Sequence, residues 1–283
     1  MILRIYAFPV VIAPTLAGAV VAGAGAHPTR WGLILWIWPA LLCLHAGVNL
    51  INDYYDFIKG VDRAGAPSTW ALTEQMLTPR QALRLAYVLL AVGPMIALPA
   101  LLARGPALWL MGLAGLAGGY WYTAPPLGLK YRGCGEVTVF LLTGPLLTAA
   151  TVLTLNGMLS GQAWLIGVPM GCLSTAILYG NNLRDRGRDR AAGFRTLAHH
   201  LGRRAHWGYP LLVLAAGLSL LPIRWAGLVD NRGLMLAVLG LSGFFIPLYT
   251  VLHHEAHNWH NIDQRTARSY LLFSACFITA LLI

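Results

Sequence analysis

The sequence predicts an all-α, polytopic membrane protein, a bundle of nine transmembrane helices. Two observations predict this class. The chain of 283 residues is 57% hydrophobic and only 11% charged, with a mean hydropathy of +0.63, whereas a soluble domain carries about 25% charged residues. Apolar runs long enough to cross a bilayer also recur along the whole chain. Too few polar residues remain to cover a water-soluble body.

Nine segments meet the requirement of about 20 mostly apolar residues for a transmembrane helix. They cover approximately residues 5–25, 31–51, 82–103, 106–122, 136–156, 162–180, 208–223, 233–252 and 268–283. Proline and glycine occur inside several of them. Membrane bundles tolerate these residues because neighbouring groups satisfy the freed backbone.

Charged residues are distributed unevenly over the connections between these spans. Most of the 20 Lys and Arg residues lie on the side of the N-terminus, and the other side has only Arg30, Arg104, Arg224 and Arg232. The positive-inside rule therefore places the N-terminus in the cytoplasm and the C-terminus outside. All acidic residues except Asp230 also fall at the cytoplasmic side. We expect a site there that binds both cations and a polyanion.

The formal net charge of +10 bears on the partners of the protein. In a soluble protein such a charge would suggest nucleic acid. Here the basic residues lie in short loops between apolar runs, which favours the headgroups of membrane lipids and an anionic substrate. We expect no nucleic-acid partner.

The first acidic segment follows the second span. Asn49, Asn52, Asp53 and Asp56 are spaced i, i+3, i+4 and i+7, so they share one face of a helix, and Asp62 comes shortly after. Hard oxygen donors in this arrangement suit Mg²⁺, which binds one or two carboxylates together with substrate phosphates. The alternative is a solvated helix end. Polar groups beside a membrane core are costly and usually functional, which favours the metal site.

The second acidic segment follows the sixth span. Asn181 and Asp185 are four residues apart, and Asn182 and Asp189 follow the same pattern more loosely. Arginines such as Arg184 and Arg188 alternate with the two aspartates. Arginine forks bind phosphate oxygens well, while carboxylates hold metal. The alternative is an ordinary positive loop with ion pairs on a helix surface. The same Asn/Asp pattern at two even-numbered span ends makes that alternative less favourable.

A third stretch, residues 120–136, connects the fourth and fifth spans on the same side. Its Pro-Pro pair and glycines predict a structured loop. Tyr122 and Tyr131 accompany Lys130 and Arg132 there, so an aromatic acceptor would lie near a diphosphate. The alternative is an interfacial aromatic belt with snorkelling cations.

Together these motifs resemble the UbiA superfamily of intramembrane prenyltransferases, over about residues 5–283. Within it the chain is most similar to the 1,4-dihydroxy-2-naphthoate polyprenyltransferases of menaquinone synthesis. The similarity lies in residues 52–62, 122–136 and 181–190. The chain departs from the naphthoate-type pattern at Phe194, where those enzymes usually have lysine.

The resemblance implies a single UbiA-like domain over residues 1–283, with an apolar central cavity for the prenyl tail. It implies that Mg²⁺ holds an allylic prenyl diphosphate between the two acidic segments, and that an aromatic small-molecule acceptor attacks the cation left when diphosphate departs. It also implies a bacterial-type inner or plasma membrane, with the N-terminus and active site cytoplasmic.

The resemblance assigns roles to individual residues. The implied catalytic residues are Asp53, Asp56, Asp185 and Asp189. The implied metal ligands are Asn52, Asp53, Asp56, Asp62, Asp185 and Asp189. The implied substrate-binding residues are Asn49, Asn52, Tyr122, Lys130, Tyr131, Arg132, Asn181 and Arg184.

Two alternatives stay open from the sequence. Another reaction of the superfamily would keep the metal site and use a different aromatic acid, a glycerol lipid, or no acceptor at all, as in a membrane terpene cyclase. A secondary transporter would place ionisable groups near the bilayer midplane, within inverted repeats. The clustering of carboxylates at one face makes the transporter less favourable. Prenyl chain length and oligomeric state are left open.

Overall fold

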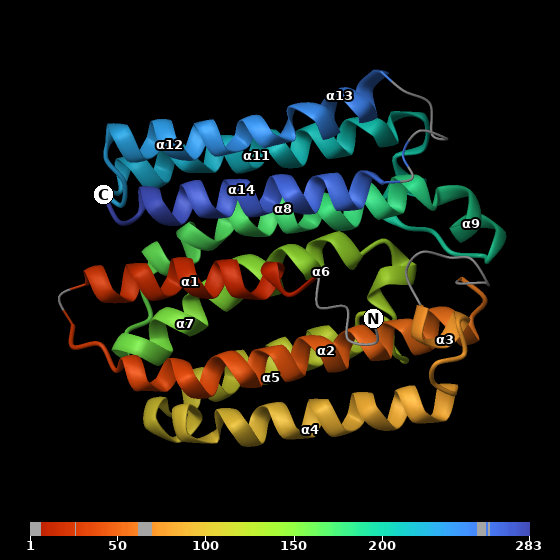
Figure 1. Ribbon diagram of the computed structural model, residues 1–283, viewed down its shortest axis with the longest axis horizontal. Coiled ribbons are helices and arrows are strands. Elements are labelled where there is room, and N and C mark those ends of the chain that lie inside the picture. The colour runs from red at the N-terminus through yellow and green to blue at the C-terminus, as the bar shows by residue number, and fades with distance from the viewer. Residues whose placement is uncertain (1–6, 26, 62–69, 254–258, 260) are drawn as a thin grey trace.

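The apolar runs fold into long helices that lie side by side, nearly parallel to the longest axis of the molecule (Figure 1). The computed structural model describes residues 7–25, 27–61, 70–253, 259 and 261–283. Within these ranges the regular structure is entirely helical. The expected all-α architecture is therefore confirmed.

The longer helices form the body of the bundle. They are α1 (Pro9–Ala24), α2 (Ile34–Ile58), α4 (Pro79–Arg104), α5 (Pro106–Trp121), α8 (Gly161–Arg184), α11 (Ala205–Trp225) and α14 (Ile262–Ala280). Two further rods are composite. One joins α6 (Gly135–Leu141), the π-helical turn η4 (Leu142–Leu146) and α7 (Leu147–Asn156), and the other joins α12 (Asn231–Leu241), η6 (Ser242–Phe244) and α13 (Phe245–His253).

Short helices lie at the ends of the bundle. They are η2 (Trp31–Leu33), α3 (Trp70–Thr73), η3 (Leu129–Arg132), α9 (Arg186–Ala191), α10 (Leu197–His200) and η5 (Gly202–Arg204). In Figure 1, α3 and α9 lie at one end of the long axis and the C-terminus lies at the other.

Six helical segments of the described chain are long and apolar enough to cross a membrane. They cover Trp31–Ile58, Pro79–Arg104, Gly135–Asn156, Gly161–Arg184, Gly202–Trp225 and Asn231–His253. All nine predicted segments overlap a helix. However, α1 and α5 have 16 residues each, and the 19-residue α14 carries Asp263, Arg265 and Arg268. By length and composition, the integral-membrane character is shown, while the count of nine stays a prediction.

Local chemistry sets where several helices begin. The α4 helix starts after Thr78, whose side chain accepts a hydrogen bond from the Gln81 backbone N–H, and α8 starts after Ser160, which caps it in a similar way. Such caps satisfy the free N–H groups of a first turn. At their other ends, α2 continues to Ile58 and α8 to Arg184, past the predicted span ends. Asn52, Asp53 and Asp56 therefore stand on α2, and Asn181 and Arg184 on the last turns of α8. Asp185 follows α8 directly.

The α8 helix is the best-buried span, and it packs against α1, α11, α14 and the α6–α7 rod. Tyr179 of α8 is fully buried, and its hydroxyl donates to the Ala205 carbonyl at the start of α11 at 2.5 Å. The neighbouring helices contribute the buried rings of Tyr209 and Tyr270. On the outside of the bundle, large apolar side chains such as Leu35 are 72% exposed. A helix with apolar outer faces is typical of a lipid environment.

Glycines allow the α6–α7 rod to approach α8 very closely. A Cβ atom on Gly144 would lie 2.5 Å from the Gly167 carbonyl oxygen, and one on Gly171 would lie 2.7 Å from the Phe140 carbonyl oxygen. Small residues permit this approach between membrane helices. The contact fixes the height of α8, and hence of its polar end, relative to α6.

Replacing Gly167 by alanine should destabilise the bundle. The new Cβ would lie 2.5 Å from the Pro145 Cα atom, and overpacking of this kind costs about 1–3 kcal/mol. Gly112→Ala is the matched control, because a Cβ there has 3.9 Å to its nearest neighbour, Leu101. Thermal unfolding in detergent should show a lower midpoint for Gly167→Ala and no loss for Gly112→Ala. Equal midpoints would contradict the close contact.

Candidate active site

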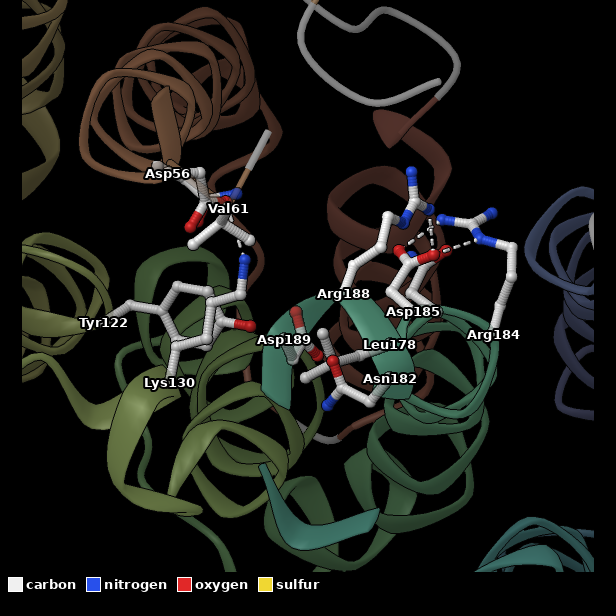
Figure 2. Close-up of a pocket in the computed structure, with 12 residues that line it drawn as sticks. Asp56, Val61, Tyr122, Lys130, Leu178, Asn182, Arg184, Asp185, Arg188 and Asp189 are labelled. Atoms are coloured by element: carbon white, nitrogen blue, oxygen red, sulfur yellow. Dashed lines mark hydrogen bonds and ion pairs between the residues drawn. The ribbon is translucent and has the colours of Figure 1, made fainter. Parts of the chain in front are cut away.

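The ends of α2 and α8 meet the loop between α5 and α6 around a pocket of about 100 Å³ (Figure 2). Most of the residues that line it are polar or charged. The lining residues are Asn52, Asp56, Val61, Tyr122, Lys130, Leu178, Asn181, Asn182, Arg184, Asp185, Arg188 and Asp189. Parts of the two acidic segments, far apart in the sequence, therefore share one pocket.

Asp56 forms the α2 wall of this pocket. Its side chain is only 3% exposed, and it accepts hydrogen bonds from the Lys130 ammonium at 2.6 Å and the Tyr131 hydroxyl at 2.8 Å. The connecting loop is held in place because the Lys130 backbone N–H donates to the Tyr122 carbonyl at 2.8 Å. Figure 2 shows Lys130 reaching toward Asp56 from that loop. A buried carboxylate is stable here because a cation compensates its charge.

Asp185 forms part of the opposite wall, just after the end of α8. The Arg184 guanidinium donates to both of its oxygens at 2.8 Å, and Arg188 donates to it as well. Burial raises the pKa of Asp185, but the hydrogen bonds and charges of these two arginines outweigh it and hold the pKa below the ordinary value. Arg184 also pairs with Asp263 of α14 at 3.0 Å. Asp185 is therefore ionised and firmly oriented.

Asp189 of α9 has a different environment on the same side. Burial raises its pKa to about 6, the charges of Asp185 and Asp56 act in the same direction, and Lys130 and Arg188 oppose them. Asp189 is only 5% exposed. Two carboxylates four residues apart thus differ in proton affinity, because only one of them is directly paired with arginines.

The buried amide oxygens of the pocket bear on metal binding. The Oδ1 atoms of Asn52 and Asn181 have no hydrogen-bond partner in the described part of the chain. Together with the carboxylates of Asp56, Asp185 and Asp189, they offer the hard oxygen donors that Mg²⁺ prefers. Among the residues of known position, which leave out 62–69, no three His, Cys, Asp or Glu side chains form a metal cluster. The donor set fits a cation whose coordination is completed by amide oxygens, water or a phosphate.

Several predicted site residues lie outside the pocket lining. Asp53 is 2% exposed on α2 but does not line the pocket, and Asn49 lies further from the helix end. Arg132 is exposed and donates to the Pro126 carbonyl at 3.0 Å. Tyr131 is not a lining residue, and its hydroxyl donates to Asp56 at 2.8 Å. The predicted ligand Asp62 lies outside the described residues.

Phe194 stands where the naphthoate-type pattern has lysine, and a lysine from another segment lies close to it. The Phe194 ring packs on the Tyr131 ring with centroids 4.5 Å apart. The Lys59 ammonium lies 3.6 Å from the Tyr131 centroid and 5.7 Å from that of Phe194. Cations are attracted to aromatic faces at such distances. A lysine from the end of α2 therefore stands beside the aromatic pair to which Phe194 contributes.

Four residues near the pocket have contacts that the sequence did not assign to them. Asn182 and Arg188 line it, Glu136 hydrogen-bonds Asn182, and Asp263 pairs with Arg184. Asn182, Arg188 and Glu136 fall within the quoted motifs, so the motif context was an available signal. Asp263 lies in a different helix, and its sequence context does not indicate this contact.

Known proteins resemble this chain in sequence and fold. The sequence matches the UbiA prenyltransferase family over residues 11–277. It is 30% identical to the UbiA prenyltransferase domain-containing protein 1 of Gallus gallus, over 99% of this chain and 83% of that protein. It is 34% identical to the 1,4-dihydroxy-2-naphthoate octaprenyltransferase of Mycobacterium tuberculosis, over 74% of this chain and 72% of that protein.

A solved structure shares the fold. It is a UbiA homolog from Archaeoglobus fulgidus bound to DMAPP and Mg²⁺, and it superimposes with a TM-score of 0.69 over 100% of this chain and 98% of that chain. The sequence identity is 16%, so this likeness concerns the arrangement of helices.

Removing the cation beside Asp56 should destabilise the protein. Lys130→Met leaves a buried carboxylate without this partner. The free energy of unfolding should fall by about 2 kcal/mol, which is the contribution of a hydrogen bond to a charged group. Adding Asp56→Asn should recover most of that loss, because the uncompensated charge is gone. A double-mutant cycle on thermal unfolding in detergent measures the coupling. Purely additive effects of the two substitutions would contradict the pair.

Proposed function

Because the chain belongs to the UbiA prenyltransferase family and is therefore a prenyltransferase, we propose that it transfers a polyprenyl group from an allylic prenyl diphosphate to an aromatic acceptor, 1,4-dihydroxy-2-naphthoate. One observation supports this most directly. Carboxylates, amide oxygens and cations from both acidic segments line the same pocket. The relative from Mycobacterium tuberculosis, named for this naphthoate reaction, supports the choice of acceptor.

In this proposal Asn52, Asp56, Asp185 and Asp189 would hold Mg²⁺ at the pocket, and the Asn181 side chain would donate its amide N–H groups to the bound diphosphate. Asp53 and Asp62 stay in the proposed ligand set on the sequence pattern alone. When bound, the cation would supply positive charge that neutralises the diphosphate and makes it a better leaving group.

The basic side chains of the pocket would bind the diphosphate oxygens. Lys130 has three N–H donors and each arginine has five, so a cation can keep its carboxylate and still donate to phosphate. Arg188 has a side chain 47% exposed and is the more accessible arginine. Arg184 is 9% exposed and engaged with Asp185 and Asp263. We therefore propose that Lys130 and Arg188 bind the diphosphate oxygens, and that Arg184 chiefly orients Asp185.

The organic step of the proposal is an electrophilic substitution on the acceptor ring. As the C–O bond to diphosphate breaks, an allylic cation forms, and the electron pair of an aromatic carbon of the acceptor attacks it. With dihydroxynaphthoic acid the ring then loses CO₂ and a proton. The Tyr122 ring lines the pocket, and an aromatic face stabilises a nearby cation. Tyr122 is our candidate to shield the cation from water.

The membrane arrangement forms part of the proposal. We propose that α1, α5 and α14 also span the membrane, which gives nine spans around an apolar cavity for the prenyl tail. Packing supports this, since α1 lies against α7 and α8, and α14 against α8 and α12. The pocket and the N-terminus would face the cytoplasm of a bacterial-type cell, because the basic residues gather at that end.

Removing one carboxylate from each wall tests the reaction. Asp56→Asn and Asp185→Asn should each lower turnover at least about 100-fold, because the site loses charge that holds the metal diphosphate. The control is Asp230→Asn, a helix cap at the opposite end of the bundle, where asparagine caps equally well. Purified variants are incubated with Mg²⁺, geranylgeranyl diphosphate and a panel of acceptors, and products are identified by mass. Wild-type turnover by both site variants would refute the proposal.

The same assay separates the alternatives. Prenylation of a glycerol lipid or another aromatic acid would replace the naphthoate acceptor, and a cyclised product without acceptor would indicate a terpene cyclase. A separate measurement in proteoliposomes tests the transporter, which would take up a solute without releasing diphosphate.

Metal affinity should depend on pH through Asp189. Its pKa of about 6 means that the carboxyl group is protonated below that pH, and a protonated carboxyl binds Mg²⁺ poorly. Between pH 7 and pH 5 the ionised fraction falls about tenfold, so the Mg²⁺ concentration for half-maximal rate should rise by about that factor. The Asp189→Asn variant should lack this dependence. An unchanged Mg²⁺ requirement in the wild type would contradict it.

A further inference from the structure

Glu136 is a buried carboxylate beside the pocket to which no role has been given above. It lies in the first turn of α6 and is only 4% exposed. Its Oε1 atom accepts a hydrogen bond from the Asn182 amide nitrogen at 2.8 Å. Its Oε2 atom is buried and has no hydrogen-bond partner in the described part of the chain. A carboxylate at such a depth is costly and usually serves a function.

This contact determines which way the Asn182 amide points. The Asn182 amide nitrogen donates to the Glu136 carboxyl group, and an oxygen that accepts this bond holds the nitrogen end of the amide toward Glu136. The amide oxygen is then the atom left for the pocket, which Asn182 lines. Figure 2 shows Asn182 on the same wall as Asp189. The buried pair thus selects one of two amide orientations that are nearly equal in shape.

The selected orientation has a chemical consequence. An amide oxygen accepts hydrogen bonds and binds hard cations, whereas an amide N–H donates to phosphate oxygens. With its oxygen toward the pocket, Asn182 repels a phosphate oxygen and favours a divalent cation. Through Asn182, Glu136 therefore favours a divalent cation over a phosphate oxygen at this part of the pocket.

We propose that Glu136 is a positioning residue that holds Asn182 so that its Oδ1 atom serves as a further oxygen donor to the divalent cation. This rests on the proposed metal-dependent prenyl transfer. The partners that orient metal ligands are commonly worth 10- to 100-fold in metal affinity. The alternative role, a general base, does not fit the burial of Oε2, because a base must reach the proton that it takes.

Three substitutions of Glu136 separate positioning from base catalysis. Glu136→Gln keeps an oxygen that can accept from Asn182. Glu136→Asp keeps the charge but withdraws the carboxylate by about 1.5 Å, the length of one C–C bond. Glu136→Leu removes the acceptor. If Glu136 positions Asn182, Glu136→Gln should keep metal binding, whereas Glu136→Asp and Glu136→Leu should weaken it. If Glu136 is a general base, Glu136→Gln should lower turnover the most.

The readout is equilibrium binding of Mn²⁺, measured by electron paramagnetic resonance on the full detergent-solubilised chain with geranylgeranyl thiolodiphosphate, an unreactive analogue. Glu136→Leu and Glu136→Asp should each weaken Mn²⁺ binding about tenfold, and Glu136→Gln should stay within about threefold of the wild type. Asn182→Ala should weaken it about as much as Glu136→Leu. The double variant should be no weaker than Asn182→Ala, because Glu136 acts through Asn182.

Thr175→Val is the matched control. The Thr175 hydroxyl donates to the Glu136 backbone carbonyl at 3.4 Å, so its loss perturbs the same buried contact between α6 and α8 and leaves the carboxylate in place. Mn²⁺ affinity should be unchanged in this variant. Thermal unfolding of every variant is measured beside binding, and a loss of affinity that merely follows the loss of stability would overturn the inference.

The outcomes distinguish this inference from the proposed function. If the wild type binds Mn²⁺ with the analogue and Glu136→Leu binds it equally well, the positioning role is wrong and the prenyl transfer stands. If Glu136→Gln loses turnover while Mn²⁺ binding is kept, Glu136 is a base and the positioning role is again wrong. If the wild type binds no Mn²⁺, both proposals fail.

Discussion

A carboxylate at the end of a membrane helix is stable only where a cation or a donor compensates its charge, and the pocket is built around this requirement. Asp56 is compensated by Lys130 and the Tyr131 hydroxyl, and Asp185 by Arg184 and Arg188. Each wall thus carries a compensated carboxylate before any ligand enters. A metal diphosphate brings both signs of charge, so it can engage these groups without leaving either sign uncompensated.

The rigid position of α8 makes that compensation possible. This helix carries the second acidic segment at its end, and its middle is held against the α6–α7 rod by the approach of Gly144 to Gly167. Hydrogen bonds between helices add to this contact, as where the buried Tyr179 hydroxyl donates to the Ala205 carbonyl. Membrane helices lack a hydrophobic drive to associate with one another, so close packing and such hydrogen bonds hold them together. The tertiary contacts far from the pocket therefore set its dimensions.

Charge compensation also links the pocket to more distant parts of the chain. Asp263 at the start of α14 holds Arg184, which in turn orients Asp185. Lys59 stands against Tyr131, the same residue that donates to Asp56. The residues that line the pocket are thus held by a shell of partners from α2, α6 and α14. In metal sites such outer partners commonly influence affinity as strongly as a ligand does.

The sequence by itself determined the all-helical membrane fold, because apolar runs of bilayer length and a shortage of charge leave no other solution. It also determined the two acidic helix ends, because the spacing of Asn52 and Asp56, and of Asn181 and Asp185, places each pair on one face of a helix wherever the helix lies. Only the tertiary structure decided which partners those groups meet. Lys130 pairing with Asp56, Asn182 with Glu136 and Arg184 with Asp263 all join separate segments, and sequence periodicity contains no information about the distance between helices.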